Sequence, residues 1–381
     1  MCREDSRLSR KIVFRCQDWC ALDAFLKSRE FGILPTGEAV ECWTLGGAGG
    51  VELEAMTYGG IVIRLLVPDR EGNRGDVVLG FNTLEEYLAG HPYFGAIVGR
   101  VAGRISNSKF VLDGKTYDLC SNDGPNHLHG GLSGFDKKLW TGKAVERRDG
   151  APSLRLSVSS PDGEEGYPGR VQVDVTYTVT NDNVFLIETS AITDRPTPLA
   201  LTHHSYFNLA GKGAGTVDEH QLQIHADEFV PADLHMTLLG RIEKVNGGSN
   251  DFRLPRRVGA AILGLFRQHG DLYRLRRSSV RGDSEALAPA ACLVHPGSGR
   301  VLNVSTTEAF LQFYTGASLG GSLTGKSGAR YGPFSGLCLE CQSYPDGANN
   351  PGLGNMILRP GEILRHTTAY AFSTTSGKDF N

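Results

Sequence analysis

The residues best suited to acid–base chemistry lie in two segments that are far apart in the chain. The first, LTHHSYFNLAG from Leu201 to Gly211, contains two adjacent histidines, and a neutral imidazole exchanges protons near pH ~6.5. The second, GLCLECQSYP from Gly336 to Pro345, places Glu340 in an apolar, strand-like run, where a buried carboxylate costs free energy unless it has partners. Glu340 and a histidine that faced the same cavity would form a general acid–base pair. Because His203 and His204 are consecutive, only one of them can face a given side of a strand.

Two arginines and two histidines are further polar candidates. Arg100 and Arg104 lie in the apolar, glycine-rich segment GAIVGRVAGRI. Each must pair with an acid or reach into a polar cleft, because its charge cannot be neutralised. His127 and His129, in NHLHGG, would share one face of a strand. Each of these histidines can be a structural residue, a ligand-contacting residue or a metal ligand.

Two more polar residues lie in strand-like runs downstream. Asp271, in HGDLYRL, starts such a run and is expected to be exposed. Gln312, in FLQFYTG, is an amide among aromatic residues, and it needs hydrogen-bond partners if it is buried. A polyhydroxylated ligand would supply several of them.

Motifs for metal or dinucleotide binding are absent or incomplete. The sequence has no G-x-G-x-x-G pattern. Ser133 and Gly134 occupy the positions where a cupin-type metal site would need a glutamate after His129. Cys338 and Cys341 lack a second cysteine pair and would point to opposite faces of a strand, so we interpret them as two buried thiols. These patterns make a metal site the less favoured interpretation of both the histidine and the cysteine pair.

The composition is that of an ordinary globular protein, with 381 residues, of which 40% are hydrophobic and 21% charged. The net charge of −3 gives no support for nucleic-acid binding, and no apolar run reaches the ~18 residues of a membrane span. The eight cysteines are scattered, and a chain of this size builds a core without disulfides. We therefore predict free thiols in a reducing, cytoplasmic compartment.

Short runs of alternating polarity, separated by turn residues, predict an all-β protein. Asp113-Gly114 marks one hairpin, and a second hairpin joins Arg170–Thr180 to Asn183–Ile192. Helical periodicity is confined to Thr83–Ala89 and Val258–Arg267.

The pattern of composition predicts a single large domain. No linker divides residues 30–375, so we expect one sandwich of antiparallel sheets there. Residues 1–29 are expected to form an N-terminal extension of unknown role, and residues 376–381 a tail. The charged, Ala/Pro-rich stretch Leu275–Ala291 is expected to be a surface loop.

In their order along the chain, these motifs resemble the aldose 1-epimerase (galactose mutarotase) family over about Phe31 to Ser373. The matching segments are DVVLGF, PYFGAIVGRVAGRI, LHGG followed by GFDK and LW, SPDGEEGYPG, SYFNLAG, QFYTG, and LECQSYPDGANN with LRPGE behind it. The resemblance implies a large β-sandwich with few short helices and an open sugar cleft. It also implies an isomerase that interconverts the α and β anomers of aldohexoses such as galactose and glucose, as a monomer or weak dimer, without metal or cofactor.

The resemblance further implies a role for individual residues. His204, directly before Ser-Tyr-Phe-Asn, would be the general acid, and Glu340 the general base. The other positions that match sugar-contacting residues or motifs are Arg104, His129, Ser205, Tyr206, Asp271 and Gln312.

The sequence departs from the family pattern at three places. Gly103 and His203 each stand where the family usually has asparagine, and Leu272 follows Asp271 where histidine is common. We expect the missing amide at Gly103 to weaken sugar binding a few-fold to about tenfold, and Gly103→Asn to restore it. These departures keep open a second hypothesis, a mutarotase-like sugar-binding protein with little or no activity. A retaining glycosidase would need a second carboxylate roughly 5 Å from Glu340, which the sequence does not supply.

Overall fold

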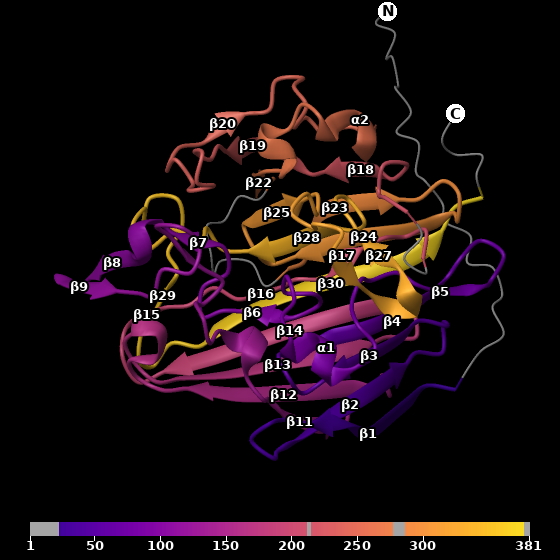
Figure 1. Ribbon diagram of the computed structural model, residues 1–381, viewed down its shortest axis with the longest axis horizontal. Helices are drawn as coiled ribbons and strands as arrows, with labels where there is room; N and C mark the ends of the chain where they lie inside the picture. The colour runs from indigo at the N-terminus through magenta and orange to yellow at the C-terminus, as the bar shows by residue number, and fades with distance from the viewer. Residues whose placement is uncertain (1–22, 212–214, 277–285, 377–381) are drawn as a thin grey trace, which may run out of the picture.

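Strands of alternating polarity form three large sheets in the computed structural model, which describes residues 23–211, 215–276 and 286–376 (Figure 1). Neighbouring strands within these sheets are antiparallel. The predicted all-β class is confirmed.

The strands are arranged as follows. The nine-stranded sheet has the order β11 (Thr141–Val145), β12 (Ser153–Ser160), β13 (Val171–Val179), β14 (Val184–Thr193), β30 (Leu364–Thr374), β24 (Arg300–Thr306), β23 (Ala288–Val294), β18 (Gln221–Ile224), β21 (Arg256–Arg257). The six-stranded sheet has the order β17 (Tyr206–Phe207), β28 (Leu337–Gln342), β25 (Phe310–Tyr314), β22 (Leu272–Leu275), β19 (Ala226–Val230), β20 (Glu243–Lys244). The five-stranded sheet has the order β1 (Phe25–Ile33), β2 (Ala39–Gly46), β3 (Glu52–Met56), β4 (Val62–Pro68), β5 (Arg74–Asp76). Small two-stranded pairs are β6 (Ile97–Val98) with β16 (Thr202–His203), β7 (Arg104–Ile105) with β10 (His127–Leu128), β8 (Lys109–Leu112) with β9 (Lys115–Asp118), β15 (Thr197–Pro198) with β29 (Ile357–Leu358), and β26 (Leu323–Thr324) with β27 (Arg330–Tyr331).

Both predicted hairpins are present. At the first, Asp113 and Gly114 have φ values of 50° and 78°, the left-handed conformation that a two-residue turn between twisted strands requires. At the second, β13 and β14 pair along their whole length, and the long strands β12, β13, β14 and β30 run side by side across the middle of the molecule (Figure 1).

The hydrophobic core lies between the sheets. One continuous cluster takes Leu53 and Leu65 from the five-stranded sheet, Leu154 from the nine-stranded sheet, and Leu311 and Leu339 from the six-stranded sheet. The apolar face of each sheet is thus covered by another sheet, as in a β-sandwich.

Helices are short and few. The first predicted helix is α1 (Leu84–Leu88), which begins at Thr83 with a capping box that includes Glu86. The second is shorter than predicted, because α2 (Val258–Ile262) ends before Arg267 and Gln268, whose φ values of 50° and 55° are incompatible with an α-helix.

Two boundaries differ from the expectation. Strand β1 begins at Phe25, so the first sheet starts inside the stretch 1–29 that was expected to be an extension. Leu275 ends β22, and Ala288–Ala291 belong to β23, so the ends of the expected surface loop are strand residues. The middle of that loop, residues 277–285, lies outside the described residues.

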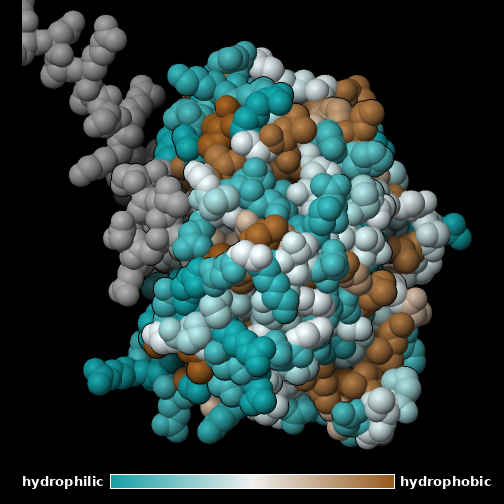
Figure 2. Space-filling model, turned by 90° about the vertical axis from the view of Figure 1, so that its left-hand side faces the viewer, coloured by the Kyte–Doolittle hydropathy of each residue, from teal (hydrophilic) through white to brown (hydrophobic). Residues whose placement is uncertain are grey.

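The surface mixes hydrophilic and hydrophobic residues. Figure 2 shows one face on which hydrophobic patches are separated by hydrophilic ones. Among the described residues, no helix has the length and apolar character needed to cross a membrane.

Candidate active site

Strand β28, which lies between β17 and β25 in the six-stranded sheet, carries Glu340. Every residue of this strand is buried, and Glu340 is only 3% exposed. Glu340 pairs with Gln312 on β25, and Gln312 pairs with Leu272 on β22. The side chain of Gln312 and the residues before Leu272 are therefore held close to the carboxylate by backbone register.

His204 meets Glu340 from a neighbouring segment. Its amide donates to the carbonyl of Ala96 (2.9 Å), and its carbonyl accepts from Gly95 (3.0 Å). These bonds fix the backbone between β16 and β17. The Nε2 atom of His204 lies 3.7 Å from Oε1 of Glu340, and both side chains are buried. The structure thus brings together the acid and base that the sequence suggested.

The other ring nitrogen of His204 faces a thiol. Cys338 lies two residues before Glu340, on the same face of β28. Its Sγ is 3.6 Å from Nδ1 of His204. Burial raises the pKa of Cys338, so the group remains a thiol. Cys341 packs into a different core cluster from Cys338, which confirms two buried thiols on opposite faces.

Burial opposes charge on both members of the pair. It raises the pKa of Glu340 to about 8, although the positive charge of Arg104 acts in the opposite direction. It lowers the pKa of His204 to about 3. Between these values the pair holds one proton, and in the empty cleft burial favours the arrangement in which both groups are neutral.

His129 is held by the backbone of Gly103. Its Nδ1 accepts a hydrogen bond from the Gly103 amide (3.1 Å), and its own amide donates to the Gly103 carbonyl (3.0 Å). Burial and the neighbouring His204 lower the pKa of His129 well below its usual range, so the ring is neutral. With Nδ1 as acceptor, the ring proton is on Nε2, which is therefore a hydrogen-bond donor.

This tautomer argues against a metal site. Ligand atoms of His129, His204 and Glu340 lie within 4.8 Å of one another. A metal would need a lone pair on the free nitrogen of His129, but that nitrogen carries the proton while Gly103 donates to the other. The donor set suits proton transfer better than metal binding.

A small cavity of about 30 Å³ lies at Gln312, the strand partner of Glu340. Its polar lining residues are Arg104, His269, Asp271 and Gln312, and the others are apolar residues and glycines; it is called the polar cavity below for those four side chains. Asp271 was expected to be exposed, but it is half-buried, and burial raises its pKa to about 6. Arg104 was expected either to pair with an acid or to reach into a polar cleft, and it does both. It lines the cavity, and its Nε donates to Asp123 at 2.6 Å.

Three of the predicted candidates have partners within the protein. The Ser205 hydroxyl lies 2.7 Å from Nε2 of His203, so it has a protein partner here, and its sugar contact stays a prediction. Tyr206 is 2% exposed, and its ring stacks on His204. Arg100 is buried among oxygens of the backbone and of hydroxyl groups, a structural role.

Two site residues were missed by the sequence analysis. His269 lines the polar cavity two positions before Asp271, although the family histidine was expected directly after Asp271. Tyr93 contacts the rings of His129 and His204 from the PYFGA motif. Its place in a matching motif was the available signal, but a tyrosine in a loop shows no periodicity.

Gly103 corrects a further expectation. Its φ is +74°, and a Cβ there would lie 2.6 Å from Cγ of Pro345. An asparagine at this position therefore cannot simply restore a missing amide. It would strain the backbone that holds His129.

We accordingly expect Gly103→Asn to raise KM about tenfold or more and to lower the melting temperature, because the new side chain displaces Pro345 or shifts the Gly103–His129 hydrogen bonds. Steady-state kinetics and thermal unfolding check this. Gly114→Asn in the exposed hairpin, also at positive φ but with no atom near a Cβ, is the matched control. An unchanged or lower KM for Gly103→Asn would contradict the expectation.

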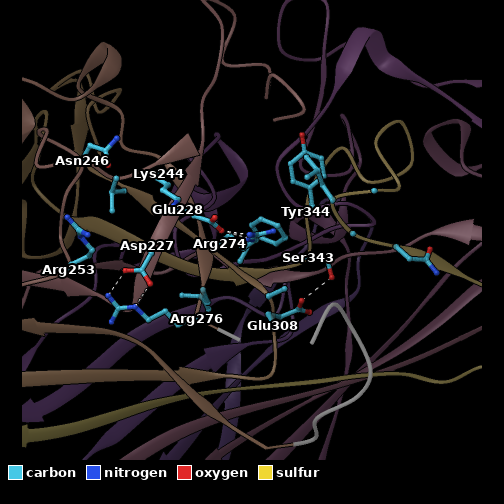
Figure 3. Close-up of a pocket in the computed structure, with 18 residues that line it drawn as sticks. Asp227, Glu228, Lys244, Asn246, Arg253, Arg274, Arg276, Glu308, Ser343 and Tyr344 are labelled. Atoms are coloured by element: carbon cyan, nitrogen blue, oxygen red, sulfur yellow. Dashed lines mark hydrogen bonds and ion pairs between the residues drawn. The ribbon is translucent and has the colours of Figure 1, made fainter. Parts of the chain in front are cut away.

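A larger cavity, of about 710 Å³, lies elsewhere on the six-stranded sheet (Figure 3). Its arginines are paired with acids, for example Arg274 with Glu228 and Arg276 with Asp227. None of the candidate site residues lines it. The larger cavity is therefore separate from the candidate site around His204 and Glu340.

A buried histidine–carboxylate pair on a large antiparallel sandwich is an arrangement suited to general acid–base chemistry. A sequence model of aldose 1-epimerase matches residues 41–371. The chain belongs to the aldose 1-epimerase family and is an isomerase.

Named relatives and solved structures agree with this assignment. The galactose mutarotase of Sus scrofa is 44% identical over 345 residues, covering 90% of this chain and 97% of the relative. The aldose 1-epimerase of Escherichia coli K12 is 33% identical over 347 residues, covering 89% and 97%. The crystal structure of a GalM/aldose epimerase homologue from C. elegans has a TM-score of 0.78 at 29% identity, covering 93% of this chain and 100% of that chain. These relatives support a mutarotase function.

Proposed function

We propose that this protein is a mutarotase that interconverts the α and β anomers of free aldohexoses such as galactose and glucose. The observation that carries the proposal is the 3.7 Å approach of His204 Nε2 to Glu340 Oε1 in a buried setting. Gln312, the strand partner of Glu340, lines a small cavity together with the polar side chains of Arg104, His269 and Asp271. Proton donor, proton acceptor and hydroxyl-binding groups are the three things that opening a sugar ring requires.

The polar cavity offers complementary partners for sugar hydroxyls. Arg104 can only donate, whereas a carboxylate at Asp271 can only accept. Gln312 donates its Nε2–H to the carbonyl of Phe313 (2.8 Å), which leaves its oxygen to accept from the ligand. Since a hydroxyl both donates and accepts, such a mixture holds a polyhydroxylated ring in one orientation.

The proposed reaction begins with the closed sugar ring. Glu340 as carboxylate takes the proton of the anomeric hydroxyl, and His204 as imidazolium gives its proton to the ring oxygen. The bond between the anomeric carbon and the ring oxygen breaks, and the anomeric C–O becomes a carbonyl. After the aldehyde end rotates, Glu340 returns its proton to the carbonyl oxygen and His204 takes the hydroxyl proton as the ring closes.

Burial favours one side of this cycle. Ring opening leaves both Glu340 and His204 neutral, which is the arrangement favoured by burial in the empty cleft. The charged arrangement, needed to start ring opening, is supported by Arg104, whose charge stabilises the Glu340 carboxylate. The pair therefore keeps one proton throughout, and only the position of that proton changes.

Polarimetry tests the proposal directly. Freshly dissolved α-D-galactose and α-D-glucose are followed to equilibrium with and without the protein. A rate that increases in proportion to protein concentration supports a mutarotase, and the two sugars give its preference. No acceleration, combined with sugar binding by calorimetry, would favour the alternative of a sugar-binding protein with little or no activity.

We expect chelation to leave the rate unchanged. The tautomer of His129 opposes metal binding by the His129, His204 and Glu340 group. The rate is measured before and after dialysis against EDTA, with galactose as substrate. Loss of activity that zinc or manganese restores would contradict the metal-free mechanism.

A further inference from the structure

Tyr93 occupies an unusual backbone position beside the acid–base pair. It lies in the loop between α1 and β6 with a φ of 62°, a left-handed conformation that is rare for an aromatic residue. Its carbonyl accepts from the amide of Ala96 (3.1 Å), the same residue whose carbonyl holds the His204 amide. Such backbone conformations persist where the surrounding structure requires them, and they cluster at functional sites.

The Tyr93 ring contacts both histidines of the site. Its centroid lies 4.6 Å from that of His129, at an interplanar angle of 60°. It lies 5.7 Å from that of His204, at 28°, so these two rings are stacked. His129 and His204 also contact each other edge to face at 5.2 Å. Tyr93 therefore contacts both His129 and His204, which also contact each other.

The ammonium group of Lys137, from a separate segment, lies over the Tyr93 ring. Nζ of Lys137 lies 5.5 Å from the Tyr93 centroid. Lys137 is anchored at 2.7 Å by Asp136, which is 1% exposed. Burial raises the pKa of the Tyr93 hydroxyl above its usual value, so the ring is neutral. The ring face is then electron-rich and attracts a cation.

We propose that Tyr93 is a positioning residue of the mutarotase site: its ring fixes the orientation of His129 and His204 and stabilises the imidazolium form of His204 by stacking. This inference rests on the proposed function. The imidazolium is the form that must donate to the ring oxygen, and an aromatic face favours that form over neutral imidazole. The groups that surround His204 are Glu340 and Cys338 on β28, Tyr206 on β17, and His91, His129 and His269 from the adjoining loops.

Two substitutions separate the ring from its hydroxyl. Tyr93→Leu removes the aromatic face and should lower kcat roughly tenfold or more with KM changed less than about threefold, because the loss concerns proton transfer and orientation. Tyr93→Phe keeps the face and should retain kcat within about threefold. Tyr117→Leu, which removes a ring stacked on Phe110 away from the site, controls for the loss of any aromatic pair.

A second measurement does not depend on activity. The imidazole C–H signals of His129 and His204 are assigned by NMR with His129→Gln and His204→Asn. In Tyr93→Leu both signals should lose the ring-current shift of Tyr93, and His204 should titrate at a lower pH than in wild type. Tyr93→Phe should preserve both properties.

The outcomes decide the two proposals separately. A wild-type protein without mutarotation overturns the proposed function, and the NMR titration then still decides whether Tyr93 controls the histidines. If Tyr93→Leu keeps more than half of kcat, or leaves the His204 titration unchanged, Tyr93 has no positioning role. If Tyr93→Phe is as impaired as Tyr93→Leu, the hydroxyl and not the ring face is what matters, and the proposal is overturned.

Discussion

Replacement of Glu340 by glutamine lowers kcat by about 100-fold or more and leaves the fold intact; this is the first of the two largest effects that we expect. The amide has nearly the shape of the carboxyl group, but it can neither accept the proton of the anomeric hydroxyl nor return it. Glu340 is 3% exposed in a fully buried strand, so an amide of nearly the same size leaves no cavity in the core. Burial already favours the neutral form of Glu340, so stability should be retained.

The measurement is the rate of galactose mutarotation with thermal unfolding alongside it. Glu308→Gln is the matched control, because Glu308 is also a buried carboxylate, accepts a hydrogen bond from Ser343 (3.0 Å) and lies outside the acid–base site. It should keep kcat within about threefold. If Glu340→Gln retained more than half of the wild-type kcat, the base would have to be another group.

The proximity of His204 and Glu340 could be predicted because each residue is recognisable from the sequence around it. A glutamate inside an apolar strand is conspicuous in any sequence, and the position of His204 in its motif distinguishes it from His203. Ser205 shares the motif with His204, but its hydroxyl lies against His203, a partner that the motif does not indicate.

Parts of the site depend on backbone conformation and on loops. Tyr93, which was missed, has a φ of 62°, and the candidates Gly103 and His129 also have positive φ values, of 74° and 53°. These left-handed positions turn their side chains or amides toward one another, and no periodicity reveals them. His269 reaches the polar cavity because the preceding segment leaves the helical conformation at Arg267. A sequence comparison that counts positions from Asp271 does not see this shift.

The pH dependence of the wild-type enzyme follows from the proton held by the pair. Below a pH of about 3 the pair holds two protons, because His204 is also protonated. Above a pH of about 8 it holds none, because Glu340 has lost its proton. Only the singly protonated pair can both give and take a proton, so kcat/KM should be bell-shaped and should fall as the pH rises through about 8.

His204→Asn should lower kcat about 100-fold or more. It should also invert the pH dependence near pH 8, where the activity of the wild type is expected to fall. Without the imidazole, the remaining activity depends on Glu340 alone as a base. Its pKa stays raised, because burial is the main cause of the shift and His204 is not among the causes. Residual activity should then rise, not fall, as the pH increases through about 8. Loss of a purely structural histidine would lower the rate without inverting the profile.

His203→Asn is the matched control for this experiment. It makes the same substitution one position earlier, on the face that bonds to Ser205, and asparagine is the residue that the family pattern usually has there. It should leave the pH profile bell-shaped and kcat within about threefold of wild type. A profile that remained bell-shaped in His204→Asn would show that another group donates the proton. His129 would then be the first candidate, because its ring lies 5.2 Å from that of His204 and its Nε2 already carries a proton.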